Sequence, residues 1–158
     1  MEYAVIFLPL VGSILGFLGK SLIKYFSEII TSLFVSISAV FSIILFWNGV
    51  QNDTYGNFKI FEWISSGSFI ANWSINIDPL SSVMLVVVTF VSALVHIYSI
   101  GYMSHDPHKP RFMSYLSLFT FSMLVLVVSD NFLQLFFGWE GVGPVSYTHL
   151  TLPTIYSV

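Results

Sequence analysis

The sequence has no cysteine and very little charge. Charged side chains make up 8% of its 158 residues, and only five of them are Lys or Arg. Without cysteine the chain can hold no disulfide, no thiolate zinc site and no cysteine-ligated iron–sulfur cluster. Four histidines are scattered, with no second ligand at a metal-binding spacing on the same helical face. A net charge of -3 with so few basic residues gives no surface for binding nucleic acid.

Most of what is present is hydrophobic. Apolar residues make up 56% of the chain, and the mean hydropathy is +0.85. This composition predicts an all-α polytopic membrane protein. We expect four full transmembrane helices and a short fifth, at residues 3–19, 29–47, 80–103, 112–128 and 131–143. The first run could be a signal peptide, but Glu2 and the absence of a preceding Lys or Arg favour a retained helix.

Residues 48–77 are polar and aromatic instead of continuously apolar. From Phe69 to Ile77 apolar and mostly polar residues alternate with a period of two, which is typical of a strand. We predict a small extramembrane β-hairpin at residues 57–77, between helices 2 and 3, with its turn at residues 65–68. Its two tryptophans, Trp63 and Trp73, are expected near the membrane interface. The alternative is an irregular loop.

The basic residues predict the orientation in the membrane. Lys20, Lys24, Lys109 and Arg111 lie after the first and third spans, whereas the loop after the second span holds only Lys59. Because basic loops stay on the cytoplasmic or matrix side, we expect the N-terminus and the hairpin on the periplasmic or intermembrane side.

Glu140 is the only ionisable residue of the fifth apolar run. It lies about 15 Å along a helix from Asp130, near the midplane of a hydrocarbon core of about 30 Å. A carboxylate there must be protonated, paired with a cation or in a hydrated cavity, so we interpret Glu140 as a proton relay. The alternative is a neutral acid that only packs. Gly138, Gly141 and Gly143 leave room beside it for another backbone or for water.

Other polar residues mark helix 3 and the start of helix 5. Asp78 is a predicted N-cap, followed by Pro79 at the first helical position. His96 lies about two turns before the end of the third span, where we expect it to be wetted. It is a second candidate relay, and a structural imidazole bonded within the bundle is the alternative. Asp130 is predicted to start the fifth helix.

Residues 144–158 break the pattern. A crossing helix should stay apolar for roughly ten residues beyond Gly143, but the chain turns instead to Pro144 and VSYTHLTLPTIYSV. This segment resembles the conceptual translation of a sequencing adapter. We therefore interpret residues 144–158 as a non-biological tail on a truncated reading frame, and a genuine C-terminal extension is the alternative.

Several short motifs together carry a resemblance to a known family. They are Ile77-Asp78-Pro79-Leu80-Ser81, His96-Ile97-Tyr98 with Gly101-Tyr102-Met103, Arg111-Phe112, Asp130-Asn131 and Gly138-Trp139-Glu140-Gly141-Val142-Gly143. Over residues 1–143 the chain resembles the N-terminal part of the subunit L or chain 5 family of respiratory complex I, NADH-quinone oxidoreductase. The departure begins at Pro144, where the family continues with Leu and a Cys-Ser-Tyr-Leu-like run.

The resemblance implies an antiporter-like, proton-translocating subunit of the bacterial or mitochondrial inner membrane. Glu140 matches the family's membrane-embedded glutamate, which pairs with a lysine on a later helix that this sequence lacks. The resemblance implies no cofactor in this chain, since NADH, FMN, iron–sulfur clusters and quinone belong to other subunits. Its expected partners are the other membrane subunits of complex I, the lipid bilayer and protons. The fragment alone is not expected to pump.

Two other functions fit the same sequence. The first is the large subunit of a monovalent cation/proton antiporter, which shares this architecture. The second is a membrane scaffold that transports nothing, in which Glu140 would be shielded and would lack a polar path towards His96.

Overall fold

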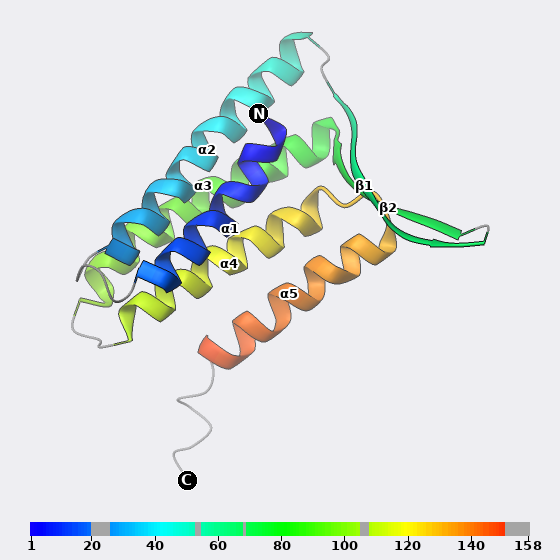
Figure 1. Ribbon diagram of the computed structural model, residues 1–158. Coiled ribbons are helices and arrows are strands. Elements are labelled where there is room, and N and C mark those ends of the chain that lie inside the picture. Colours follow the sequence, from blue (N-terminus) through cyan, green and yellow to red (C-terminus); the bar gives the residue numbers. More distant parts are fainter. Residues whose placement is uncertain (20–25, 53–54, 68, 105–107, 151–158) are drawn as a thin grey trace.

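The computed structural model describes residues 1–19, 26–52, 55–67, 69–104 and 108–150, with side chains up to residue 143. Within these residues the elements are α1 (Glu2–Leu18), α2 (Phe26–Asn52), β1 (Gly56–Ser66), β2 (Phe69–Ile77), α3 (Pro79–Tyr102), α4 (Lys109–Val127) and α5 (Phe132–Leu150). The helices lie side by side in a bundle, and the hairpin projects from one end of it (Figure 1). The prediction of a mostly helical chain with a small two-stranded sheet is therefore confirmed.

Three of the described helices, α2, α3 and α4, are long and apolar enough to cross a membrane. Helix α1 is also apolar, but its 17 residues give only about 26 Å, somewhat less than a hydrocarbon core of about 30 Å. The predicted count of four full spans is thus not confirmed. Helix α2 is longer than predicted because backbone hydrogen bonding continues past the apolar run to Asn52.

Helix α5 also differs from the prediction, in its length. It was expected to end at residue 143, but it continues through Pro144 to Leu150. A proline inside a helix removes one backbone donor without always ending the helix. The helical backbone of residues 144–150 does not test the origin of the tail, which stays a prediction.

Helix packing depends on hydroxyl groups that reach across to the backbone of a neighbour. Helix α1 packs on α2 and α4, and α2 also packs along α3. Pro9 inside α1 has no N–H, so the carbonyl of Val5 lacks its helical donor, and Ser38 of α2 donates to it instead. On the other side, Ser117 of α4 donates to the carbonyl of Pro9 at 2.7 Å. The proline is thus tolerated because its neighbours use the carbonyls around it.

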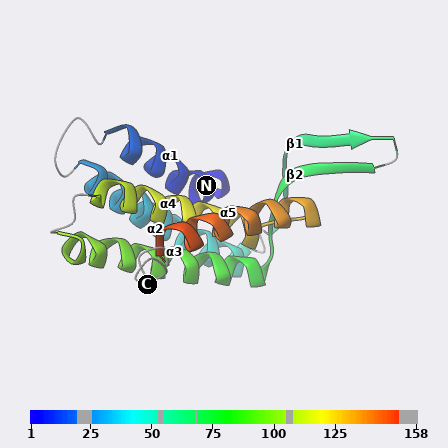
Figure 2. The same cartoon turned by 90° about the horizontal axis from the view of Figure 1, so that it is seen from below.

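The hairpin forms where the alternating pattern predicts it. Strands β1 and β2 pair antiparallel, with Phe58 opposite Ile75 and Phe61 opposite Trp73. Gly67 at the turn has a φ of 60°, a left-handed conformation that glycine adopts without strain. The alternative of an irregular loop is therefore wrong, and the hairpin extends away from the end of the bundle (Figure 2).

The base of the hairpin is joined to the start of α5 by side-chain amides. Gln134, which is fully buried, accepts a hydrogen bond from Ser74 N at 3.2 Å and donates one to Ser74 O at 2.8 Å. In effect its amide pairs with β2 as another strand would. Asn131 donates to the carbonyl of Asn72 at 2.6 Å. The orientation of α5 is thus set by β2 as well as by α4.

The N-cap of α5 is Asn131 and not Asp130, which corrects the prediction. Asn131 Oδ1 accepts a hydrogen bond from the backbone N–H of Gln134 at 2.9 Å. Asp130 accepts a hydrogen bond from the Ser74 hydroxyl at 2.9 Å, so its carboxylate serves the contact with β2. Two adjacent residues could both cap, and the neighbouring strand decides between them.

Helix α3 begins with a reciprocal cap at Asp78. Its carboxylate accepts from Ser81 N at 2.6 Å, and the Ser81 hydroxyl accepts from Asp78 N at 2.8 Å. Pro79 follows inside the first turn. The backbone N–H of Ser81, followed by its hydroxyl, holds the pKa of Asp78 below its usual value.

Candidate functional site

Two glycines fix the position of Glu140 by pressing α5 against α4. A Cβ on Gly138 would lie 2.8 Å from the backbone nitrogen of Leu126, and one on Gly141 would lie 2.6 Å from the Ser122 hydroxyl. Because Gly138 and Gly141 are three residues apart, they share one face of the helix. The expected close approach of another backbone is found at Gly138, where that backbone belongs to α4, whereas Gly141 meets a side chain and Gly143 has nothing within 4 Å.

Glu140 therefore points away from α4, on the outer face of α5. Its side chain is exposed and has no hydrogen-bond or ion-pair partner among the described residues. Trp139 beside it is 65% exposed, and Phe136 one turn earlier is 59% exposed. Helix α5 lies at the side of the bundle (Figure 1), so this face, carrying one acid among large apolar side chains, is open to lipid or to another protein segment.

His96 has the opposite environment, because it is fully buried in the bundle. Its Nδ1 lies 2.7 Å from the carbonyl oxygen of Ser92, so Nδ1 carries the donated proton, and Nε2 is an acceptor when the ring is neutral. The Ser92 hydroxyl in turn lies 2.5 Å from the hydroxyl of Thr120 on α4. His96 has no exposed surface within the described helices, and its expected contact with water stays a prediction.

The structure does not bring the two candidate relay residues together. His96 faces the interior between α2, α3 and α4, whereas Glu140 faces outwards from α5, and α4 contacts both α3 and α5. The hydrogen bonds of the described residues form no polar path from Glu140 to His96. Each residue must therefore be assessed as a separate site.

A buried ion pair between Glu28 and Lys109 was not predicted from the sequence. Glu28 lies in the first turn of α2 and Lys109 is the first residue of α4, and their charged atoms are 2.7 Å apart. Both side chains are less than 10% exposed. Sequence reasoning assigned Lys109 to a basic loop and Glu28 to the opening of a span. The sequence offered one signal for this pair: Glu28 and Lys109 lie near the starts of two spans that begin on the same side of the membrane.

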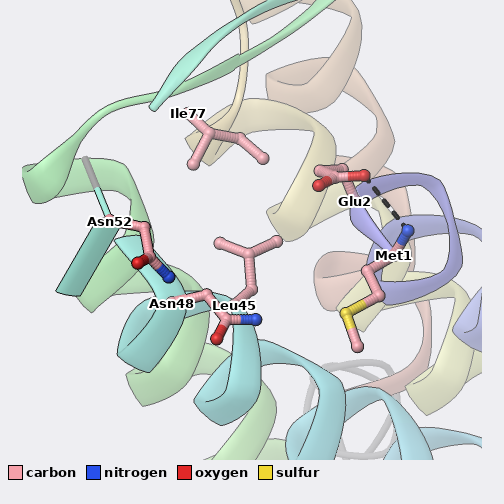
Figure 3. Close-up of a pocket in the computed structure, with 6 residues that line it drawn as sticks. All are labelled: Met1, Glu2, Leu45, Asn48, Asn52 and Ile77. Carbon is pink, nitrogen blue, oxygen red and sulfur yellow. Dashed lines mark hydrogen bonds and ion pairs between the residues drawn. The ribbon is translucent and has the colours of Figure 1, made fainter. Parts of the chain in front are cut away.

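A small polar pocket lies at the hairpin end of the bundle. It has a volume of about 300 Å³ and is lined by Met1, Glu2, Leu45, Asn48, Asn52 and Ile77 (Figure 3). The Glu2 carboxylate in its wall pairs with the N-terminal ammonium at 3.1 Å. Across the part of the chain that the structure describes, no three His, Asp or Glu side chains gather in a way that could hold a metal ion.

Comparison with known proteins identifies one family. Residues 63–113 match the family model described as NADH-ubiquinone oxidoreductase (complex I), chain 5 N-terminus. That range covers the end of β1, all of β2, all of α3 and the start of α4. It contains the cap at Asp78 and the buried His96.

Proteins that match almost the whole of this chain are chain 5 or subunit L proteins. NADH-ubiquinone oxidoreductase chain 5 of Arabidopsis thaliana is 53% identical over 148 residues, which is 93% of this chain and 22% of the relative. NADH-quinone oxidoreductase subunit L of Rickettsia conorii is 51% identical over 144 residues, which is 90% of this chain and 22% of the relative. The chain thus spans less than a quarter of the length of these curated relatives.

Proposed function

Because this chain belongs to the family of complex I chain 5 and subunit L proteins, we propose that it forms the N-terminal part of a proton-translocating membrane subunit of NADH:quinone oxidoreductase. In this role it contributes no redox centre, and NADH, FMN, the iron–sulfur clusters and quinone bind to other subunits. Its partners are the other membrane subunits, the lipid bilayer and the protons that it moves. Identity of about half the residues over almost all of the chain supports this proposal.

The observation that carries the mechanism is the placement of Glu140. The contacts of Gly138 and Gly141 with α4 fix the rotation of α5, so the acid is held on the open face. Within the described helices nothing neutralises it. An acid on an apolar, lipid-accessible face is costly unless another segment supplies a cation or a hydrated cavity. The structure therefore supports a site that another part of the full-length subunit completes.

The proposed chemistry at Glu140 is proton exchange controlled by a neighbouring charge. A cation brought next to the carboxylate stabilises its ionised form, so the proton leaves. When the cation moves away, the neutral acid is favoured and a proton returns. Moving one proton against 100 mV requires about 2.3 kcal/mol, which a change in one close charge pair can supply in a medium of low dielectric constant.

The membrane orientation follows from the same proposal. The basic residues that follow α1 and α3 lie on the matrix or cytoplasmic side, and the N-terminus and hairpin lie on the intermembrane or periplasmic side. Because relatives occur in a plant and in a bacterium, the proposed membrane is a mitochondrial or a bacterial inner membrane. Trp63 and Trp73 contact Phe137 of α5, which keeps the hairpin close to the first half of that helix.

The test of the proposed function is Glu140→Gln in the full-length subunit, assembled in its complex and reconstituted in liposomes. Gln keeps the shape of the side chain but cannot exchange a proton at neutral pH. We expect the number of protons pumped per NADH oxidised to fall by at least about a third, measured from the quenching of a pH-sensitive dye against the rate of NADH oxidation.

The matched control is Glu62→Gln. Glu62 is an exposed acid on β1 that pairs with Lys59 at 2.8 Å, and it should leave the ratio unchanged. An unchanged ratio in the Glu140 variant would reject Glu140 as a relay and favour the scaffold function. Pumping that follows sodium ions and not protons would favour the antiporter alternative.

A further inference from the structure

Two buried polar atoms on facing helices have no protein partner. They are Nε2 of His96 on α3 and Oγ of Ser32 on α2, and neither makes a hydrogen bond within the described residues. His96 is fully buried and Ser32 is 7% exposed. A buried polar atom without a hydrogen bond costs about 1–3 kcal/mol, so native structures seldom contain one without a reason.

The contact between α2 and α3 places these two residues at nearly the same level along the bundle. The hydroxyls of Ser42 and Thr89 are 2.7 Å apart, which fixes the register of the two antiparallel helices. His96 follows Thr89 by seven residues and Ser32 precedes Ser42 by ten. At about 1.5 Å per residue, their levels along the axis differ by only about 4.5 Å. One water molecule, with hydrogen bonds of about 2.8 Å on two sides, can bridge atoms about 5 Å apart.

The same face of α2 leads from Ser32 to the buried ion pair. Glu28 precedes Ser32 by one turn, so both residues lie on one side of the helix. Lys109 of α4 holds the Glu28 carboxylate at 2.7 Å. A buried ion pair gains little net stability, since desolvation offsets most of the attraction. Glu28 and Ser32 thus place a charged and a polar side chain on one face of α2, between this end of the bundle and the level of His96.

Towards the hairpin end of the bundle, apolar side chains follow the polar ones. Beyond the pair Ser42 and Thr89, the next buried residues are Leu45 of α2 and Leu85 of α3, which are 8% and 1% exposed. They separate the hydroxyls from the polar pocket that contains Glu2 (Figure 3). Buried polar residues of α2 therefore lie between the level of His96 and the end with Glu28 and Lys109, whereas Leu45 and Leu85 lie towards the hairpin end.

We propose that water bound between Ser32 and His96 forms a proton inlet that opens at the Glu28–Lys109 end of the bundle. The water donates one hydrogen bond to Nε2 of His96 and exchanges a second with the Ser32 hydroxyl. A proton that enters beside the ion pair reaches the water, and the water passes a proton to Nε2. The imidazole becomes an imidazolium, while the second proton stays on Nδ1 and remains hydrogen-bonded to Ser92 O. The use of this inlet in pumping rests on the proposed function, whereas the water site does not.

The experiment uses the full-length subunit in its complex and has two readouts. The first is a cryo-EM map at a resolution that shows ordered water elsewhere in the membrane domain. We expect a water density within about 3.2 Å of both Ser32 Oγ and His96 Nε2, lost in Ser32→Val. The second is the proton pumping rate, which we expect to fall at least about threefold in Ser32→Val. Ser36→Val is the control, because Ser36 lies on the same helix and bonds only to the carbonyl of Ser32.

Each outcome decides the proposal. A map in which no water joins the two atoms, or in which His96 Nε2 bonds directly to protein, overturns it. A lost water with an unchanged pumping rate in Ser32→Val overturns the inlet. A reduced rate in Ser32→Val, with normal pumping in Glu140→Gln, supports the inlet while rejecting the relay at Glu140.

Discussion

The two ionisable candidates have opposite surroundings: His96 lies in the interior of the bundle, and Glu140 lies on the outer face of α5. His96 is fully buried, its Nδ1 is bonded to Ser92 O, and the hydroxyls of Ser92 and Thr120 lie close by. Glu140 lies among exposed aromatic side chains, and no described residue binds it. The difference shows that these helices enclose one polar site by themselves, whereas the other requires a partner segment. Substitutions that disturb each region separately test this comparison.

The largest loss of stability is expected from Lys109→Met, which removes the buried ion pair with Glu28. The change leaves the Glu28 carboxylate buried without its cation, and such a loss costs about 3–5 kcal/mol. We expect a lower melting temperature of the purified full-length subunit, measured by the temperature dependence of aggregation in detergent. Replacing both partners, Glu28→Gln with Lys109→Met, should recover most of the loss because no charge then remains buried.

The exposed pair of Lys59 and Glu62 supplies the control for that experiment. Both side chains are about half exposed, so Lys59→Met should change the free energy of unfolding by less than about 1 kcal/mol. A similar fall in both single variants would show that burial does not distinguish the two pairs.

A smaller effect is expected from Gly138→Ala, which shifts the outer face of α5. The new Cβ would lie 2.8 Å from the backbone nitrogen of Leu126, which cannot move aside as a flexible side chain can. We expect a loss of about 1–3 kcal/mol from this overpacking, and protease cleavage near α5 should become faster. In Gly143→Ala the new Cβ meets nothing within 4 Å, so the change should be neutral or stabilising.

The smallest effect is expected at the cap that begins α3, the helix carrying His96. Asp78→Ala removes the acceptor for Ser81 N and should cost about 1 kcal/mol. The pKa of Asp78 is lower in the folded chain, so its contribution is present above the unfolded value of about 3.9 and is lost as the pH falls through the folded value. Stability measured from pH 6 down to pH 2 should therefore fall less in Asp78→Asn than in the parent.

The sequence was sufficient for features that depend on local pattern. Apolar runs located α1, α3 and α4 to within three residues, whereas α2 and α5 end five and seven residues later than predicted. The period of two located the hairpin. The cap at Asp78 could be predicted because all of its partners lie within four residues. The position of Glu140 on a helix could be predicted, but its outward orientation depends on which face of α5 meets α4.

Features that depend on distant residues could not be predicted in this way. Glu28 and Lys109 are 81 residues apart, and no sequence pattern links them. The choice of Asn131 over Asp130 as the cap depends on Ser74 of β2, and the burial of His96 depends on α2 and α4. In each case tertiary packing decided between residues that were locally equivalent.

The amide of Gln134 has a mechanical consequence. Two hydrogen bonds join it to one residue of β2, and Glu140 lies six residues further along the same rigid helix, about 9 Å away. A tilt of the hairpin would therefore rotate α5 about the contact between Gln134 and Ser74 and displace Glu140 sideways. A partner that binds and tilts the hairpin would thereby move the Glu140 carboxyl group.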